Sequence, residues 1–211
     1  MFAGSSGKIS RRTITSKAEL KGTIDACLKL SPKDDCSSSH HGPIAAWDVS
    51  TVTDMSNLFT DANSFNDDIS KWDVSSVTDM SSMFLETSFD GDLSKWDVSS
   101  VTDMSSMFQG VASFNGDIRK WDVSRVTDMA KMFMDATSFS GELKNLFTNP
   151  NAFNGDISKW DVSRLTSMDH MFFNAASFKR KLCGAAWINS EASMKKMFTG
   201  SSGSASWTAC T

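Results

Sequence analysis

Apolar residues recur along the chain in one fixed pattern of spacings. In one unit of this pattern the apolar positions are Ile69, Trp72, Val74, Val77, Met80, Met83 and Phe84. The alternation of Trp72 and Val74 about Asp73 predicts a short strand over residues 70–75, with Trp and Val inward and the polar residues outward. The spacing of the two Met residues and the Phe predicts a short helical turn, which Thr78 or Asp79 begins as a cap.

The unit is copied several times, and each copy is close to W-D-V-S-x-V-T-D-M-x-x-M-F-x-x-A-x-S-F-N-G-D-I-S-K. Regular units run over residues 47–71, 72–95, 96–120 and 121–144. Residues 145–159 match only the back of the first unit, which predicts an irregular or shortened coil there. Further units begin at residues 160 and 187. The tryptophans that open the units are predicted to form a core ladder: Trp47, Trp72, Trp96, Trp121 and Trp160.

These units are predicted to stack, because no single unit can bury its own apolar edge. The first tryptophans are 25, 24 and 25 residues apart, and the i, i+3, i+5 spacing is similar to that of leucine-rich repeats. We therefore expect an α/β solenoid of about six coils over residues 47–186, with short parallel strands about 4.8 Å apart and short helical turns.

Both ends of the stack are predicted to carry caps. Ser16 and Glu19 form a capping box, and Leu20, Ile24, Cys27 and Leu28 share one face of a helix that ends ahead of Pro32. Residues 16–46 are thus an N-terminal cap and residues 187–211 a C-terminal cap. Residues 1–15 match residues 197–211 at eight of fifteen positions. This match marks residues 1–15 as the tail of a preceding tandem unit, or else as a linker with a chance similarity.

The W-D-V-S-x-V-T-D-M-x-x-M-F and S-F-N-x-D-I-S-K motifs resemble those of BspA-type leucine-rich-repeat surface proteins, including the group first catalogued as a domain of unknown function in mycoplasma lipoproteins. The resemblance covers about residues 47 to 199. It implies a right-handed leucine-rich-repeat solenoid on a cell surface, without enzymatic activity, that serves adhesion or structure.

All four cysteines lie outside the regular units, and two disulfides are predicted: Cys27 with Cys36 and Cys183 with Cys210. Four cysteines allow three pairings, so this pairing is one of three. Disulfides favour an extracellular, oxidising location. The net charge of −4 and the pI near 5.3 disfavour nucleic acid as a partner. No apolar stretch is long enough for a membrane helix, so membrane insertion is not expected.

Two charged rows are the candidate binding residues. They are Lys71, Lys95, Lys120 and Lys159, and Asp73, Asp97, Asp122 and Asp161. On the functional interpretation they form a charged lattice for a polysaccharide, a mineral or another copy of the chain. On the structural interpretation the two rows only neutralise each other.

Other polar groups are given structural roles. Asp54, Asp79, Asp103 and Asp128 are expected in helix caps, and Asp68, Asp92, Asp117 and Asp156 in turns. Calcium between such rows and zinc at Cys27, Cys36, His40 and His41 are weaker alternatives. His170 is expected to be structural.

No catalytic motif is present, and no carboxylate pair stands out for glycoside hydrolysis. We therefore expect a non-enzymatic protein without a cofactor. The first functional hypothesis is an extracellular adhesive or structural module that binds a repetitive polymer or surface through uniform side-chain rows. The alternative is a subunit that self-assembles into an extracellular fibre or surface layer.

Overall fold

The protein was analysed as a computed structural model, which describes residues 13–30, 36–37, 41–136 and 153–206. Helix α1 spans Lys17–Leu30, the 3-10 helix η1 spans Ile44–Ala46, and helix α2 spans Ala185–Ile188. Strands β1 (Lys181–Leu182) and β2 (Ser204–Ala205) form a parallel two-stranded sheet in which Lys181 pairs with Ser204 and Leu182 with Ala205.

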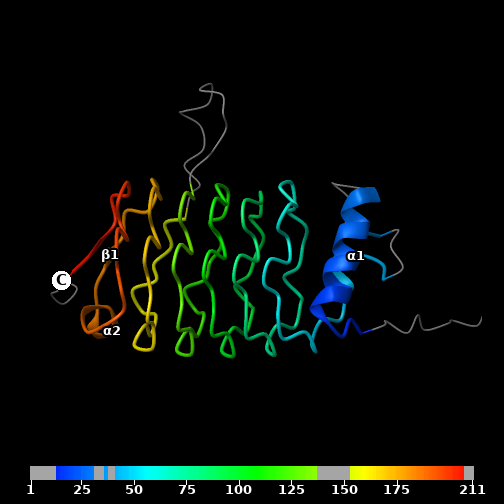
Figure 1. The fold of residues 1–211 in the computed structure, drawn as a ribbon, viewed down its shortest axis with the longest axis horizontal. Helices are drawn as coiled ribbons and strands as arrows, with labels where there is room; N and C mark the ends of the chain where they lie inside the picture. Colours follow the sequence, from blue (N-terminus) through cyan, green and yellow to red (C-terminus); the bar gives the residue numbers. More distant parts are fainter. Residues whose placement is uncertain (1–12, 31–35, 38–40, 137–152, 207–211) are drawn as a thin grey trace, which may run out of the picture.

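The predicted N-terminal helix is present as α1, and its cap is close to the predicted capping box. The Glu19 N–H donates to Ser16 Oγ at 3.2 Å, while the Glu19 carboxylate accepts from the Thr15 N–H at 3.0 Å. Leu20 and Ile24 are buried against the core. Because α1 lies at one end of the molecule, its apolar face covers the first repeat unit (Figure 1).

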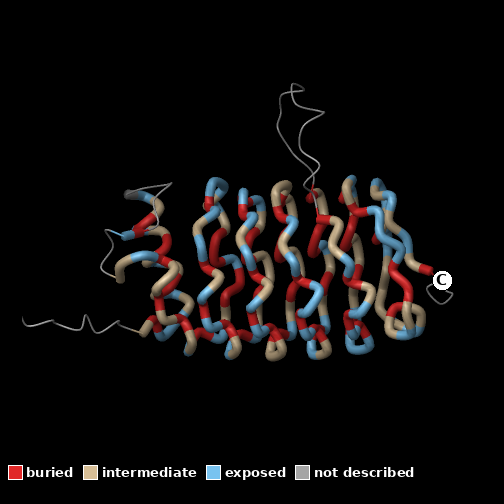
Figure 2. Tube along the Cα trace, turned by 180° about the vertical axis from the view of Figure 1, so that it is seen from behind, coloured by how far each residue is buried: buried red, intermediate tan, exposed pale blue. Residues whose placement is uncertain are grey.

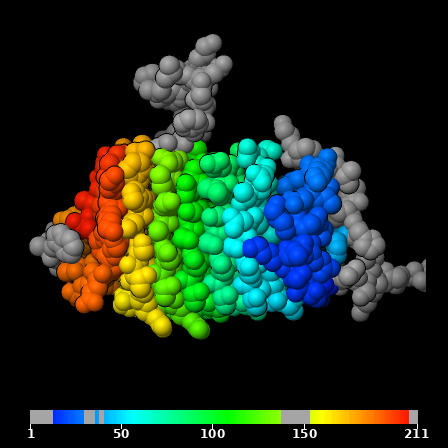
Figure 3. Space-filling model, in the orientation of Figure 1, coloured from blue at the N-terminus to red at the C-terminus, as the bar shows by residue number. Residues whose placement is uncertain are grey.

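The repeat units lie side by side along the long axis, and each forms one layer (Figures 1 and 3). Isolated parallel bridges connect the same position in successive layers: Asp54, Asp79, Asp103, Asp128, Ser167 and Ser193. Next to these bridges, the N–H of every second residue donates to the following layer. The N–H groups of Met80 and Ser82, for example, donate to the carbonyls of Asp103 and Ser105 at 3.0 and 2.8 Å.

The core consists of aromatic columns that run through the layers. In one column the ring centroids of Phe59, Phe84, Phe108, Phe133, Phe172 and Phe198 are 5.3 to 5.7 Å apart. A second column contains Phe65, Phe89, Phe114, Phe153 and Phe178, at 5.9 to 6.3 Å. Along every layer, buried segments alternate with exposed ones (Figure 2). The buried side chains of the successive layers form one continuous core.

From Trp72 to Trp187, each tryptophan donates a hydrogen bond to a backbone carbonyl that lies shortly before the preceding tryptophan in sequence. All five predicted ladder residues are buried. Trp96 Nε1 donates to the Ile69 carbonyl at 3.2 Å and Trp121 Nε1 to the Leu93 carbonyl at 3.0 Å, and Trp72, Trp160 and Trp187 make the corresponding bonds. Each indole N–H is therefore satisfied inside the core, where an unpaired donor would be costly.

The predicted α/β leucine-rich-repeat solenoid is wrong. The described parts of residues 47–180 contain neither a helix nor a regular strand, and they are built from turns, bends and isolated bridges. The expected strand over residues 70–75 stops early because the chain turns at once, with the Val77 N–H donating to the Val74 carbonyl at 2.9 Å.

The expected helical turn over Met80–Phe84 is absent because every layer places residues in the left-handed region. Ser82 has a φ of 54° and Glu86 a φ of 57°. A right-handed helix cannot continue through such residues. The same conformation recurs in the other layers, at Asn57, Ser106, Lys131, His170 and Lys196, and four residues later at Asp61, Gly110, Asp135, Asn174 and Gly200.

The described part of the predicted irregular coil, residues 153–159, joins the layer of residues 121–136. Residues 145–152 lie outside the described residues, but Phe153 takes a place in the same layer as Phe133, with ring centroids 4.2 Å apart. The bridge from Asp128 leads directly to Ser167. The described residues 121–136 and 153–159 thus belong to one layer.

Candidate binding surface

The predicted aspartate row is exposed and held in a fixed conformation. In each of the four layers that contribute to the row, an Asp Oδ1 accepts from the backbone N–H two residues later, at 3.0 to 3.1 Å, as Asp97 does from Ser99. Ser75 and Ser99 also donate their hydroxyls to the same carboxylates at 2.6 Å. Such Asx turns fix the direction of the side chain, so the layers present their carboxylates in the same way.

These hydrogen bonds also favour the charged carboxylate. The hydroxyl and backbone N–H of Ser99 hold the pKa of Asp97 below its usual value, and Ser124 and Ser163 do the same for the pKa of Asp122 and Asp161. The charge of Asp122 opposes this lowering at both Asp97 and Asp161. Carboxylates of neighbouring layers are therefore close enough to repel one another.

The lysine row is also exposed. Its charges act on the row that contains Asp68 and Asp92, and not on the candidate aspartate row. Within the part of the chain that the structure describes, no ion pair joins the lysine row to the Asp73 row. The hydrogen bonds from Ser70 and Ser94 lower the pKa of Asp68 and Asp92, and the charges of Lys71 and Lys95 add to this lowering. Direct pairing of the two candidate rows thus does not explain their recurrence.

A further uniform row was missed from the sequence. It contains exposed threonines, one in each of five layers: Thr53, Thr78, Thr102, Thr127 and Thr166. From Thr78 onward, each Oγ1 donates to the carbonyl of the preceding threonine in the row, at 2.9 to 3.2 Å. The signal was the threonine of every V-T-D or L-T-S segment, which we interpreted only as a possible helix cap.

The aspartate and threonine rows border a common surface. A hollow of about 720 Å³ near α2 is lined by both Asp161 and Thr166, together with Ser163 and Arg164. These residues follow one another within a single layer. Since the layers repeat, the two rows run side by side along the stack and reach this hollow at its end.

The other aspartates have local structural roles. Asp79 Oδ1 accepts from the Ser81 N–H at 2.8 Å, and Asp54, Asp103 and Asp128 make the same bond, although no helix follows. The predicted turn role of Asp68, Asp92, Asp117 and Asp156 is confirmed, since each accepts from the N–H two residues later. No group of three His, Cys, Asp or Glu residues in the described ranges is arranged to hold a metal ion.

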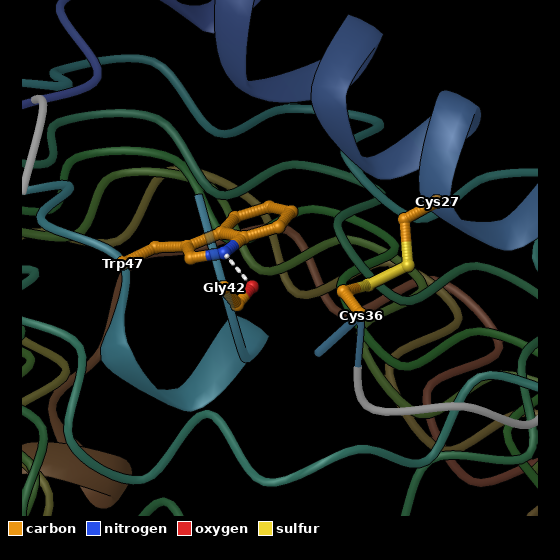
Figure 4. Close-up of a disulfide and its surroundings, with 4 residues drawn as sticks. All are labelled: Cys27, Cys36, Gly42 and Trp47. Atoms are coloured by element: carbon orange, nitrogen blue, oxygen red, sulfur yellow. Dashed lines mark hydrogen bonds between the residues drawn. A yellow bond between two sulfur atoms is a disulfide. The ribbon is translucent and has the colours of Figure 1, made fainter. Parts of the chain in front are cut away.

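A disulfide closes the N-terminal cap on itself, and an ion pair connects the cap to the stack. A disulfide joins Cys27 of α1 to Cys36, with the Cα atoms 5.5 Å apart, and Trp47 Nε1 nearby donates to the Gly42 carbonyl at 2.9 Å (Figure 4). Lys17 Nζ donates to both carboxylate oxygens of Asp54, at 3.0 and 3.2 Å.

The Cys27–Cys36 pairing is thus confirmed, and the zinc interpretation fails because the disulfide consumes both thiols. His40 lies outside the described residues. His41 lies with its ring centroid 6.0 Å from that of Trp47. Cys183 is disulfide-bonded, while its predicted partner Cys210 lies outside the described residues. His170 occupies one of the left-handed positions, with a φ of 59°.

These observations define a class of protein: a layered repeat protein with uniform exposed rows and a disulfide-fastened helical cap. The chain belongs to the family described as "Mycoplasma protein of unknown function, DUF285", which matches residues 33–145 and 140–207. No curated protein and no solved structure matches it. None of the described helices has the length and apolar character needed to cross a bilayer.

Proposed function

We propose that the protein is an extracellular, non-enzymatic adhesive module that binds a repetitive polymer or surface along the aspartate and threonine rows. The observation that carries this proposal is the uniformity of the two rows, which present the same groups in successive layers in fixed orientations. The resemblance of the repeat motifs to BspA-type surface proteins and the disulfides support the same location and role.

The chemistry of the rows limits the partner. The Asp97 carboxylate only accepts hydrogen bonds, and the Thr102 hydroxyl already donates to the Thr78 carbonyl, which leaves its oxygen as an acceptor. The two rows themselves therefore offer acceptors and negative charge. They fit a partner that presents hydroxyl, amine or cationic donors at regular intervals, such as a polysaccharide fibre or a mineral face.

Many weak contacts give firm attachment only when they engage together. A single exposed ionic or hydrogen-bonded contact contributes less than about 1 kcal/mol. Four equal contacts held on one rigid surface act as a multivalent ligand, so their free energies combine without a separate loss of translational freedom for each. We therefore expect affinity to depend steeply on the number of intact row positions.

The test is co-sedimentation of the folded chain with a panel of insoluble polysaccharides, including chitin, chitosan and cellulose, and with carbonate particles. The first variant replaces the aspartate row with Asn at positions 73, 97, 122 and 161. Asn keeps the acceptor of each Asx turn, so the fold is preserved while the charge is removed. A matched control replaces Asp68, Asp92, Asp117 and Asp156 with Asn in the same way.

The expected result is loss of binding in the first variant and retention in the control, with single Asp→Asn changes having small effects. Equal binding by both variants would show that the aspartate row is not the contact surface. Failure of the wild-type chain to bind any material in the panel would contradict the proposal as a whole.

A further inference from the structure

The last described layer, residues 187–206, ends in an open backbone edge. In the layer before it, the N–H groups of Phe172 and Asn174 donate to carbonyls of the last layer at 2.9 and 2.8 Å. The equivalent N–H groups of the last layer belong to Phe198 and Gly200. No residue in the described ranges accepts from them.

The same edge also carries free acceptors. Strand β2 and the residue after it donate hydrogen bonds to the preceding layer. The Ser204 N–H donates to the Arg180 carbonyl, and the Ser206 N–H donates to the Leu182 carbonyl. The carbonyls of Gly203 and Ala205 take the equivalent outer positions. Among the described residues they receive no backbone hydrogen bond. The edge thus offers donors and acceptors in a fixed order.

An aromatic column ends at this edge with a ring that is only partly buried. Within the column, each of the rings Phe84, Phe108, Phe133 and Phe172 lies between two others and is 0 % exposed. Phe198 is only partly buried. Its ring stacks on Phe172 at 5.7 Å, with an interplanar angle of 3°. A partly exposed apolar ring beside these backbone groups is a surface that another segment can cover.

The chain contains a segment whose sequence is nearly that of the layer it would cover. Residues 1–10 read MFAGSSGKIS and residues 197–206 read MFTGSSGSAS, with seven identities in ten. Throughout the stack, equivalent residues of successive units lie on one another. Residues 1–10 therefore have the composition of a further partial layer, with Phe2 equivalent to Phe198 and Gly4 to Gly200.

The segment must come from another molecule. The helix α1, which follows it closely in sequence, lies at the opposite end of the stack from β1 (Figure 1). The Ile14 N–H is already bonded to the Asp48 carbonyl of the first layer, at 2.9 Å. Within one chain, Ile14 is thus fixed at the end remote from the open edge, and the four residues from Ser10 to Ile14 span at most about 14 Å.

The geometry points to head-to-tail assembly, in which residues 1–10 of one copy add a partial layer to the open edge of a second copy. Phe2 stacks on Phe198. The Phe198 and Gly200 N–H groups donate to the carbonyls of Met1 and Ala3, and the N–H groups of Lys8 and Ser10 donate to Gly203 and Ala205. This register repeats the one observed between the last two layers. It gives the self-assembly alternative a defined interface.

The inference is independent of adhesion, because the rows lie along the side of the stack and this edge lies at its end. Its test is sedimentation equilibrium of the full chain over a wide range of concentration. The wild type is expected to form oligomers whose mean mass rises steadily with concentration. Phe2→Ser is expected to weaken association by about tenfold or more.

Two further variants sharpen the test. Gly200 has a φ of 78°, so the matching Gly4 must adopt a left-handed conformation that Val cannot, and Gly4→Val should also abolish association. Arg12→Ser lies outside residues 1–10 and should leave association unchanged.

Hydrogen exchange identifies the surface that is covered. The amides of Phe198 and Gly200 should gain protection as the concentration of wild type rises, and should not do so in Phe2→Ser. A strict monomer, a closed dimer that Phe2→Ser leaves intact, or association without protection at these two amides would each overturn the inference.

Discussion

Replacement of a ring in the middle of the aromatic column should cost far more stability than replacement of the ring at its end. Phe108 is 0 % exposed, and its ring lies 4.0 Å from Phe114, 5.5 Å from Phe84 and 5.6 Å from Phe133. Truncation of such a buried Phe to Ala removes about 3 to 5 kcal/mol of stability, through lost burial and the cavity that remains. For a domain of this size, that loss lowers Tm by roughly 6 to 20 °C.

Phe198→Ala is the matched control. Phe198 belongs to the same column and stacks on Phe172, but it is only partly buried, and no described ring covers its outer side. Because fewer contacts and less apolar area are lost, we expect a cost of about 1 to 2 kcal/mol. Both variants should be compared with wild type by urea unfolding, followed by tryptophan fluorescence and circular dichroism at low protein concentration.

The comparison also tests whether the layers depend on one another. If the columns stabilise the protein by continuous packing, the central variant loses at least twice as much free energy of unfolding as the terminal one. Equal losses in the two variants would refute the reasoning, because they would mean that the position in the column does not determine the contribution of a ring.

Three further predictions concern the backbone, the cap and the acidic row. Ser106 has a φ of 55°, so Ser106→Val should lower the free energy of unfolding by about 1 to 2 kcal/mol while Ser106→Gly does not, as urea unfolding would show. Reduction of Cys27–Cys36 removes a restraint that contributes about 2 to 3 kcal/mol, so the α1 amides should exchange faster while those near Ser106 keep their protection. The pKa of Asp97 and of Asp122 is lower in the folded state than in the unfolded state. Their contribution to the free energy of unfolding is therefore complete above the unfolded-state pKa of about 3.9, and it is lost as pH falls through the folded-state pKa. Tm should therefore be constant between about pH 7 and pH 5 and fall below about pH 4, and Asp97→Asn should reduce that fall.

The repeat pattern predicted the inward residues well because burial depends mainly on which side chains are apolar. Trp72, Val74, Met80 and Phe84 are all buried, as the periodicity indicated. The N-terminal helix was predictable for a similar reason, since its cap residues and its apolar face lie within one short segment.

The backbone conformation was not predictable from the same pattern. A Met-x-x-Met-Phe spacing is typical of a helix, but Ser82 between them is left-handed. Serine has no strong preference for that conformation, and what holds it there is the bonding of alternate N–H groups to the next layer. Contacts between distant parts of the sequence therefore override the local preference, and the sequence of one unit does not reveal them.

The candidate surface was only half predictable. The aspartate row was found because charged residues at a fixed repeat are easy to recognise. The threonine row was missed because a threonine that precedes an aspartate, as Thr102 precedes Asp103, also fits a helix cap. The role of threonine became clear only when its hydroxyl was seen to donate to the carbonyl of Thr78 in the neighbouring layer.

The central claim is that equivalent residues of successive units lie on one another and thus form the exposed rows. Engineered disulfides test it most directly, by pairing Thr102→Cys with Thr127→Cys in one variant and Thr78→Cys with Thr127→Cys in another. Adjacent layers are about 5 Å apart, within disulfide reach, whereas positions two layers apart are about 10 Å apart and beyond it. The account predicts that the first variant cross-links on mild oxidation and the second does not; cross-linking of the second variant alone, or of neither, would contradict it.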